Sequence, residues 1–374
     1  MTLSLSRREI LAGSAAFALC GMAAPQRKTR VMPPVPPQAF VFGHRGACAL
    51  RPEHTLESYA RAMADGADFV EPDLVPTRDG VLVARHEPNI AETTNVADHP
   101  EFADRRKVLT IDGEQQEGWF THDFTLAELK TLRCKERLGA VRPESMGYDG
   151  KFEIVTLDEI VAFVKAEGTK ARREVGLIPE IKHSTFFASA GFDMEGLFLA
   201  AFNRLPYLQD APLIVQSFET AGLKRLRREI GQYGNVQLMQ LFDEDAKRPA
   251  DVVAAKGKTT YGEMATPMGF YKVADYADWV CAPTERIFNT RDEGRHLVRT
   301  EFLADAQRAE LLVAAYTFRP ENRFLPPNLR NGGDNDRNQA GAVAYMRRFL
   351  NAGLNGVFTD DPAIGRLAES DWGQ

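Results

Sequence analysis

Short hydrophobic runs recur along the chain from residue 39 onward, and eight of them have the length and β-branched content of buried strands. These runs are residues 39–43, 68–75, 176–182, 212–218, 236–242, 277–283, 311–318 and 355–361. A further run, residues 81–87, predicts an extra strand after the second one. Most of the runs are separated by polar segments with a helical period, so we predict alternating strands and helices.

The predicted helices have apolar residues at three- and four-residue spacing. They are residues 54–66, 156–168, 193–205, 219–231 and 338–353. Gly66, Gly168 and Gly353 stand where helix C-caps are expected. Alternating strands and helices imply a parallel sheet, and eight strands favour a closed (β/α)8 TIM barrel, an α/β fold, over an open doubly wound sheet. The sequence has no GxGxxG or Walker-type phosphate loop to favour the open sheet.

Two long polar stretches interrupt the alternation. Residues 88–123 follow the extra strand, and because a structureless loop of this length is unusual in a compact domain, we predict an insertion over the barrel mouth. Residues 318–339 form a second polar loop after the seventh strand. The prolines and charges of residues 25–38 are typical of an extended linker, so the barrel domain is expected to span residues 39–374.

Residues 1–24 have the composition of an export signal. Arg7 and Arg8 precede a short, weakly apolar stretch, and small residues suitable for cleavage follow near Ala23 or Ala24. This order resembles a twin-arginine signal, which implies the twin-arginine export machinery as a partner and a periplasmic or otherwise exported protein. The apolar run is shorter than the roughly 20 residues of a membrane span, so we expect no transmembrane segment in the mature chain.

The cysteines add little chemistry. Lipidation at Cys20 ranks below simple cleavage, because Leu19 is bulkier than lipoprotein sites usually accept. The remaining thiols, Cys48, Cys134 and Cys281, allow at most one internal bridge and have no CxxC spacing. A disulfide scaffold and a thiolate metal site are therefore not expected.

Charge bears on the class of ligand. The formal net charge is -6, and the chain has no extended basic run, so we expect no nucleic-acid partner. An anionic substrate would need a local cluster of cations, while a small or neutral one would not.

Acidic residues close two of the predicted barrel strands. Residues two apart in a strand face the same way, so Glu71 and Asp73 share one face, as do Glu180 and Lys182. The C-terminal strand ends are where such barrels carry their active sites. Three carboxylates at one mouth would repel each other without a cation, and an oxygen-only set favours Ca²⁺ first, with Mg²⁺ as the alternative. The competing interpretation is that these acids are solvated strand ends.

Two histidines are predicted at the same rim. His44 follows the first strand and His86 ends the extra strand, and a pair of imidazoles can act as general base and general acid near neutral pH. Arg45 and Lys182 bring positive charge to the rim, which fits the binding of an anion. Their alternative role is to neutralise the acids.

The chain resembles a known family at these positions. Residues 44–87, HRGACALRPEHTLESYARAMADGADFVEPDLVPTRDGVLVARHE, resemble the opening of glycerophosphodiester phosphodiesterases. The resemblance continues in order through PEIK at 179–182, QSF at 216–218, YTFR at 316–319 and VFTDDP at 357–362. The segment WFTHDFTLAELKTLR and the insertion resemble the exported, periplasmic bacterial branch of that family.

The resemblance implies a role for each matched residue. The implied acid–base pair is His44 and His86, the metal ligands are Glu71, Asp73 and Glu180, the phosphate is held by Arg45 and Lys182, and the rings of Phe218 and Phe318 lie near the glycerol. Two residues depart from the family pattern: Glu87 stands where Asp is common after the second histidine, and Pro72 stands between the first two ligands.

The expected function is metal-dependent hydrolysis of a glycerophosphodiester to sn-glycerol 3-phosphate and an alcohol. A hydroxyl next to the phosphodiester would attack phosphorus and form a cyclic phosphate, with one histidine as base and the other as acid. Three alternatives remain: a phosphodiesterase for another lipid-derived or polyol phosphodiester, a glycosidase, or a non-catalytic glycerol-phosphate-binding protein. A glycosidase gives no role to the two histidines and the two cations.

Overall fold

The computed structural model describes residues 38–291 and 296–370. The predicted export signal and nearly all of the predicted linker lie outside the described residues. Among the helices that are described, none is long and apolar enough to cross a membrane. The thiols of Cys48, Cys134 and Cys281 are buried and unbridged.

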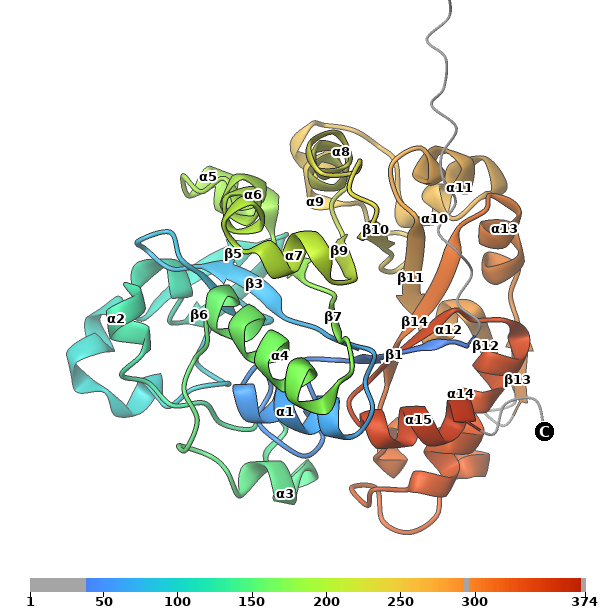
Figure 1. The fold of residues 1–374 in the computed structure, drawn as a ribbon, viewed down its shortest axis with the longest axis horizontal. Helices are drawn as coiled ribbons and strands as arrows, with labels where there is room; N and C mark the ends of the chain where they lie inside the picture. Colours follow the sequence, from blue (N-terminus) through green and yellow to red (C-terminus); the bar gives the residue numbers. More distant parts are fainter. Residues whose placement is uncertain (1–37, 292–295, 371–374) are drawn as a thin grey trace, which may run out of the picture. The chain divides into compact units, whose positions relative to one another are not determined.

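The described strands close into a parallel barrel, as the strand count predicted (Figure 1). In order around the barrel they are β1 (Phe40–Gly43), β2 (Phe69–Val70), β7 (Gly176–Leu177), β9 (Leu213–Ser217), β10 (Val236–Leu241), β11 (Trp279–Pro283), β14 (Leu312–Phe318) and β15 (Gly356–Thr359), which pairs with β1 again. All of these neighbours are parallel. The architecture is therefore a (β/α)8 barrel.

Two of the predicted strands are each interrupted by a proline. The second continues after Pro72 as β3 (Asp73–Pro76), and the third continues after Pro179 as β8 (Glu180–Ile181). Proline has no N–H to donate to a strand ladder, so regular pairing lapses at both positions. Pairing then resumes with Asp73 opposite Glu180 and Glu180 opposite Gln216. The two prolines come directly before Asp73 and Glu180, and Glu71 lies directly before the first of them.

The extra strand is shorter than its hydrophobic run. It is β4 (Leu82–Ala84), and it pairs with β3 in the antiparallel direction. His86 and Glu87 therefore lie beyond the end of the strand.

Four of the five long helices, all except α8 (Thr220–Glu229), begin at a residue whose side chain caps the helix. The five long helices are α1 (Leu56–Ala64), α4 (Leu157–Ala171), α6 (Met194–Arg204), α8 and α14 (Gln339–Ala352). The hydroxyl of Thr156 accepts from the backbone of Glu159, whose carboxylate accepts from Thr156 in return, which makes a capping box for α4. Helix α14 ends at Gly353, whose φ of 102° is the left-handed conformation that glycine tolerates.

The predicted C-cap at Gly168 is wrong. Helix α4 continues past it and ends at Arg172. A Cβ at Gly168 would lie 2.8 Å from the carbonyl oxygen of Arg173. Gly168 thus allows the chain to fold back closely over the last turn of the helix. The helix itself does not end at this glycine.

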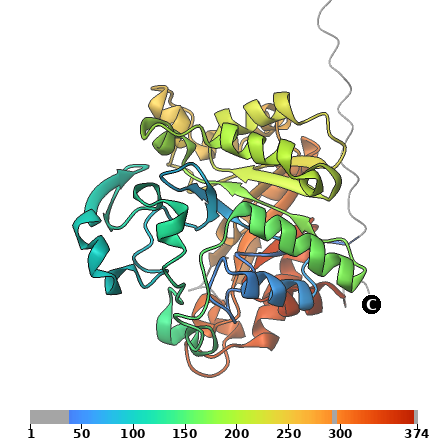
Figure 2. The ribbon, with the colours of Figure 1, turned by 60° about the vertical axis from the view of Figure 1, so that its left-hand side comes forward.

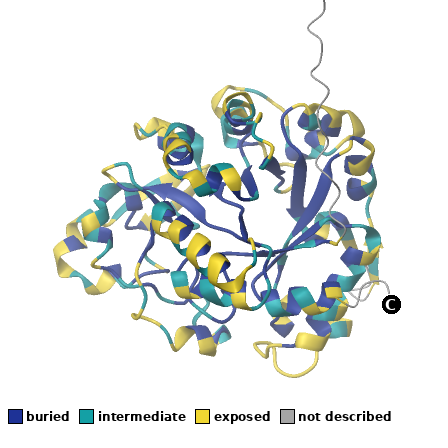
Figure 3. Cartoon of the chain, viewed as in Figure 1, coloured by how far each residue is buried: buried dark blue, intermediate teal, exposed yellow. Residues whose placement is uncertain are grey.

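The shorter elements complete the outer layer. They are α5 (Ser184–Ser189), α7 (Pro206–Asp210), α9 (Ala250–Ala254), α10 (Tyr261–Met264), α11 (Pro267–Ala274), α12 (Thr284–Ile287), α13 (Phe302–Arg308), α15 (Pro362–Ser370) and the hairpin of β12 (Phe288–Arg291) and β13 (His296–Arg299). The barrel strands are buried on both faces, as Figure 3 shows in dark blue. Aromatic rings fill the barrel interior: Phe42, Phe69, Trp279 and Phe358. Both aliphatic and aromatic side chains pack between the strands and the helices.

The segment between β4 and α4 lies to one side of the barrel (cyan in Figure 2). It contains the 3-10 turns η1 (Val96–Asp98), η2 (Pro100–Arg105), η3 (Thr121–Asp123) and η4 (Gly139–Val141), the hairpin of β5 (Lys107–Ile111) and β6 (Glu114–Gly118), and the short helices α2 (Leu126–Leu129) and α3 (Pro143–Met146). The polar loop after β14 contains η5 (Asn322–Phe324) and η6 (Pro327–Leu329). Both long polar stretches thus have local structure.

Candidate active site

Three buried carboxylates converge at the C-terminal ends of the barrel strands. Oxygen atoms of Glu71, Asp73 and Glu180 lie within 4.8 Å of one another. Each residue is at most 5% exposed. The structure therefore brings together the three acids that the strand ends predicted.

Neighbouring donors satisfy most, but not all, of these oxygens. Glu71 accepts from the Gln216 amide at 2.6 Å and from the backbone N–H of Arg45 at 3.0 Å. Lys182 lies 2.9 Å from Glu180. Asp73 Oδ2 lies 2.9 Å from His54 Nε2, whereas its Oδ1 is buried without a hydrogen-bond partner.

The electrostatics of this cluster fit a bound cation. Burial, then the charges of Asp73 and Glu180, raises the pKa of Glu71 well above its usual value. Burial also raises the pKa of Glu180, to about 7. A divalent cation among hard oxygen ligands would favour the ionised form of all three acids and would give Asp73 Oδ1 a partner. The donor set thus fits Ca²⁺ or Mg²⁺.

His44 is buried beside the carboxylate cluster. Its Nδ1 lies 2.5 Å from Oδ1 of Asp360, and its Nε2 lies 3.9 Å from Oε2 of Glu71. Its backbone N–H donates to the carbonyl of Thr359 at 3.0 Å, which joins the end of β1 to the end of β15. Burial lowers the pKa of His44 to about 4, although the charge of Asp360 acts in the opposite direction. The ring is therefore neutral at pH 7.

His86 lies at a more open part of the same rim. Its Nδ1 is 2.8 Å from Oε1 of Glu87, and the two side chains are 31% and 38% exposed. Burial of part of the ring, then the charges of Arg45 and Lys182, lowers its pKa. Glu87, the departure from the family pattern, is thus the hydrogen-bond partner of the second histidine.

Both predicted phosphate-binding cations are paired with acids in this structure. The Arg45 guanidinium donates to both oxygens of Glu53, at 3.0 and 3.2 Å, and its Nε is buried without a hydrogen-bond partner. Nε lies 3.7 Å from Asp73. Both cations therefore neutralise acids in this structure, and their phosphate-binding role stays a prediction.

Several residues of the site were missed by the sequence analysis. Glu53 binds Arg45 and His54 binds Asp73, and the available signals were their place at the start of a predicted helix and within the segment that carries the family resemblance. Asp360 belongs to the VFTDDP motif but received no role. Gln216 received none either, although QSF was part of the resemblance. Arg142, which contacts Asp360, lies between η4 and α3, beyond the predicted insertion, and had no sequence signal.

A cavity of about 900 Å³ opens beside the cluster. Four of the predicted site residues line it, namely His86, Glu180, Lys182 and Phe218. The β5–β6 hairpin and helices α5 and α9 form its outer walls, and Tyr261 and Tyr316 add two further rings. The insertion thus supplies one wall of the space next to the candidate catalytic groups.

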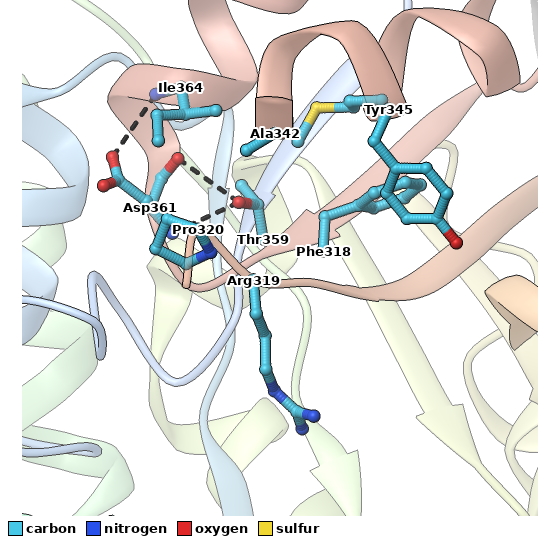
Figure 4. Close-up of a pocket in the computed structure, with 9 residues that line it drawn as sticks. Phe318, Arg319, Pro320, Ala342, Tyr345, Thr359, Asp361 and Ile364 are labelled. Carbon is cyan, nitrogen blue, oxygen red and sulfur yellow. Dashed lines mark hydrogen bonds between the residues drawn. The ribbon is translucent and has the colours of Figure 1, made fainter. Parts of the chain in front are cut away.

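Phe318 does not line that cavity. Its ring packs against Tyr345, with ring centroids 5.7 Å apart (Figure 4). It also packs against Phe349, with ring centroids 5.0 Å apart. The small hollow around it has no room for a water molecule. The pairing of β14 with β15 shifts register between Ala315 and Phe318, so Tyr316 faces the barrel interior while Phe318 faces the helices. The expectation that Phe318 lies near the glycerol therefore has no support in this geometry.

Comparison with known proteins gives the same picture. The model of the glycerophosphoryl diester phosphodiesterase family matches residues 44–364. A glycerophosphodiester phosphodiesterase of Arabidopsis thaliana is 31% identical over 334 residues, covering 86% of this chain and 83% of the relative. The glycerophosphodiester phosphodiesterase of Haemophilus influenzae is 28% identical over 381 residues, covering 98% and 96%.

Solved structures share the fold. One from Silicibacter pomeroyi has a TM-score of 0.60 at 20% identity, covering 89% of this chain and 93% of the other. An Oleispira antarctica phosphodiesterase, solved in complex with the product sn-glycerol-3-phosphate, has a TM-score of 0.56 at 18% identity, covering 88% and 96%. With its barrel, its rim of carboxylates and histidines, and a family match over most of its length, this chain belongs to the glycerophosphoryl diester phosphodiesterase family.

Proposed function

We propose that this protein hydrolyses glycerophosphodiesters to sn-glycerol 3-phosphate and an alcohol. The observation that carries the proposal is the meeting of two histidines, two cations and three buried carboxylates at one barrel rim, in a chain that belongs to the diesterase family. The names of the curated relatives give the same substrate class. The cavity has room for an alcohol group beyond the phosphate, because pockets of about 300–1,000 Å³ hold ligands larger than glycerol phosphate.

The proposed chemistry uses His44 and His86 as an acid–base pair. One histidine takes the proton of the glycerol hydroxyl next to the phosphodiester, and that oxygen attacks phosphorus. The other gives a proton to the oxygen of the departing alcohol, which leaves a cyclic phosphate. Water then opens the ring as the two histidines reverse their roles. Arg45 and Lys182 stabilise the added negative charge on the phosphoryl oxygens.

We propose that Glu71, Asp73 and Glu180 hold a divalent cation, with Ca²⁺ as the first candidate and Mg²⁺ as the second. The unpartnered oxygen of Asp73 and the raised pKa of Glu180 support this role. When bound, such an ion supplies positive charge to the phosphate oxygens and to the attacking hydroxyl. The rest of the reaction is the work of the chain's own side chains.

A glycosidase fits the site less well. The oxygens of the three acids approach within 4.8 Å, closer than the roughly 5–9.5 Å that separates the two carboxyl groups of glycosidases. That chemistry also leaves two histidines and two cations without a role. A protein that only binds glycerol phosphate would need the cations but not both histidines.

The decisive experiment is an assay of sn-glycerol 3-phosphate release from a panel of glycerophosphodiesters. The panel should vary the alcohol from choline and ethanolamine to glycerol and inositol, with nitrophenyl glycosides as the control substrates. We expect release that EDTA abolishes and Ca²⁺ or Mg²⁺ restores. Tight binding of glycerol phosphate without turnover of any diester would leave the binding protein as the better description.

The pH dependence of metal affinity tests the carboxylate cluster. Metal binding must displace the protons that the raised pKa values of Glu71 and Glu180 hold on these two carboxyl groups, so affinity should rise as the pH increases from 5 to 8. Calorimetric titration of EDTA-treated protein with Ca²⁺ between pH 5 and 8 measures this slope. Glu180→Gln should reduce the slope.

Glu219→Gln is the matched control for that titration. Burial also raises the pKa of Glu219 to about 7, and its carboxylate lines the same cavity, but its partner is Thr185 and it is not one of the three clustered acids. The variant should keep the wild-type slope. An affinity that does not change with pH in the wild-type protein would show that the ion binds elsewhere.

We further propose that the protein is exported by the twin-arginine route. The support is the sequence of residues 1–24, with Arg7 and Arg8 before a weakly apolar stretch. Replacing both arginines with lysine should leave folded precursor in the cytoplasm, as cell fractionation would show. Normal delivery of the double variant would exclude this route.

A further inference from the structure

A network of buried ion pairs begins at His44. Asp360 accepts from His44 at one oxygen, and its other oxygen accepts a short hydrogen bond from the guanidinium of Arg142. Nε of Arg142 donates to Glu321 at 2.7 Å. The side chains of Asp360, Arg142 and Glu321 are 2%, 4% and 3% exposed. This network of ion pairs thus extends from the candidate active site into the protein interior.

Its members come from three separate parts of the sequence. Asp360 follows the last barrel strand, Arg142 lies between η4 and α3, beyond the predicted insertion, and Glu321 lies in the polar loop after β14. Arg319, from the same loop as Glu321, also approaches Asp360 at 3.4 Å. The segment between β4 and α4, at a point beyond the predicted insertion, and the polar loop after β14 therefore meet at one carboxylate.

The donor atoms of this network do not suit a metal ion. His44, Cys48 and Asp360 have ligand atoms within 4.8 Å of one another. However, the Arg142 guanidinium already donates to Asp360 and to the carbonyl of Cys48, at 3.1 Å for the latter. Burial raises the pKa of the Cys48 thiol, which keeps it protonated. The guanidinium of Arg142 already balances the negative charge of Asp360, and the Cys48 thiol is neutral. No negative charge therefore remains for a metal ion to balance.

We propose that Asp360, held in place by Arg142 and Glu321, is a positioning residue that keeps His44 as the Nδ1–H tautomer with Nε2 turned toward the carboxylate cluster. This inference rests on the proposed function, because it gives His44 an orientation for that reaction. A carboxylate next to Nδ1 requires the proton on Nδ1, so the lone pair of the neutral ring lies on Nε2. That is the nitrogen 3.9 Å from Glu71, on the side where the phosphodiester would bind.

The network also provides the hydrogen-bond partners that the Asp360 carboxylate needs because it is buried away from solvent. A carboxylate that could rotate would let the imidazole turn, and a buried charge without partners would be costly. Arg142 occupies the second oxygen of Asp360, and Glu321 occupies the Nε of Arg142, so each group has a defined direction. The two long loops therefore preorganise a general acid–base group before substrate arrives.

The tautomer can be read directly by ¹⁵N NMR of protein labelled at its histidines, with the His44 signals assigned by their absence in His44→Asn. In the metal-free wild-type protein at neutral pH, we expect a protonated Nδ1 and an unprotonated Nε2. Asp360→Asn should shift the population toward the Nε2–H form, because the amide can donate to Nδ1. The corresponding change in a Ser-His-Asp triad lowers kcat by about 10⁴-fold, so kcat should fall about 10²- to 10⁴-fold here with little change in KM.

Asp361→Asn is the matched control. Asp361 is the next residue, is equally buried, and binds Arg337 and the start of α15 with no contact to His44. Its variant should keep the wild-type His44 tautomer and kcat. A general loss of packing near β15 would instead affect both variants alike.

The outcomes separate the two proposals. A wild-type spectrum with His44 in the Nε2–H form would overturn the positioning role, and it needs no variant to fold. Loss of kcat in Asp360→Asn with an unchanged tautomer would overturn it too. If the wild-type protein hydrolyses no glycerophosphodiester, the proposed function fails, whatever the tautomer of His44.

Discussion

The two histidines of the rim differ in what surrounds them. The His44 side chain is 10% exposed, and its partner Asp360 is held by a second and a third buried charge. The His86 side chain is 31% exposed, its partner Glu87 is 38% exposed, and it borders the large cavity. Both rings use Nδ1 to contact a carboxylate, so the difference lies in the support behind that carboxylate and not in the contact itself.

This difference suggests that the two histidines contribute to the reaction in different ways. A buried network fixes one group before binding, at the cost of desolvating several charges. An exposed pair holds its histidine weakly and can adjust as a substrate fills the cavity. We therefore expect the His44 side to set the reaction geometry, and the His86 side to accommodate different alcohols.

The largest effect should come from removing either histidine. His44→Ala and His86→Ala should each lower kcat by about 10²- to 10⁴-fold, because each removes a proton transfer from the reaction. The variant that lacks the acid should regain rate on a nitrophenyl ester, whose leaving group needs no proton, and the variant that lacks the base should not. Steady-state kinetics on both substrates measures this.

A matched control for the pair is His99→Ala. His99 contacts Glu101 in the insertion, and it does not line the cavity. Its variant should keep wild-type turnover. If His44→Ala and His86→Ala also keep it, the two-histidine mechanism is wrong.

A large effect on stability should separate the buried network from surface pairs. Arg142→Met leaves Asp360 and Glu321 as buried charges without their counter-ion, so the free energy of unfolding should fall by about 3–5 kcal/mol. Arg204→Met is the control, because Arg204 and Asp158 are 58% and 40% exposed and such pairs contribute about 0–1 kcal/mol. Urea unfolding monitored by circular dichroism compares them. Equal losses of unfolding free energy in the two variants would show that the buried network stabilises the protein no more than a surface ion pair does.

The smallest effect should come from the partner of His86. Glu87→Gln keeps a hydrogen-bond acceptor near Nδ1 of His86, and both side chains are partly exposed. The value of kcat should therefore change by no more than about fivefold, the equivalent of about 1 kcal/mol. The same acid-to-amide change at Asp360 should cost far more. A loss at Glu87 as large as that at Asp360 would remove the distinction between the two sides of the rim.

Local sequence patterns were sufficient for the barrel and for most of the rim. Strand and helix periods depend on neighbouring residues, so the eight runs predicted the barrel strands. The alternation of side chains along a strand placed Glu71 and Asp73 on one face, and the common direction of parallel strands brought Glu180 to them. These inferences need only the spacing of residues within a strand and the polarity of the sheet.

Only the tertiary structure decided the features that depend on distant segments. The family resemblance implied that the Phe318 ring lies near the glycerol, whereas the register shift between β14 and β15 places it against the helices. Arg142 meets Asp360 across 218 positions of sequence, and no local period encodes such a contact. The support of His44 therefore depends on how two long loops pack against the barrel, because a buried charge takes whichever partner the fold brings within hydrogen-bonding distance.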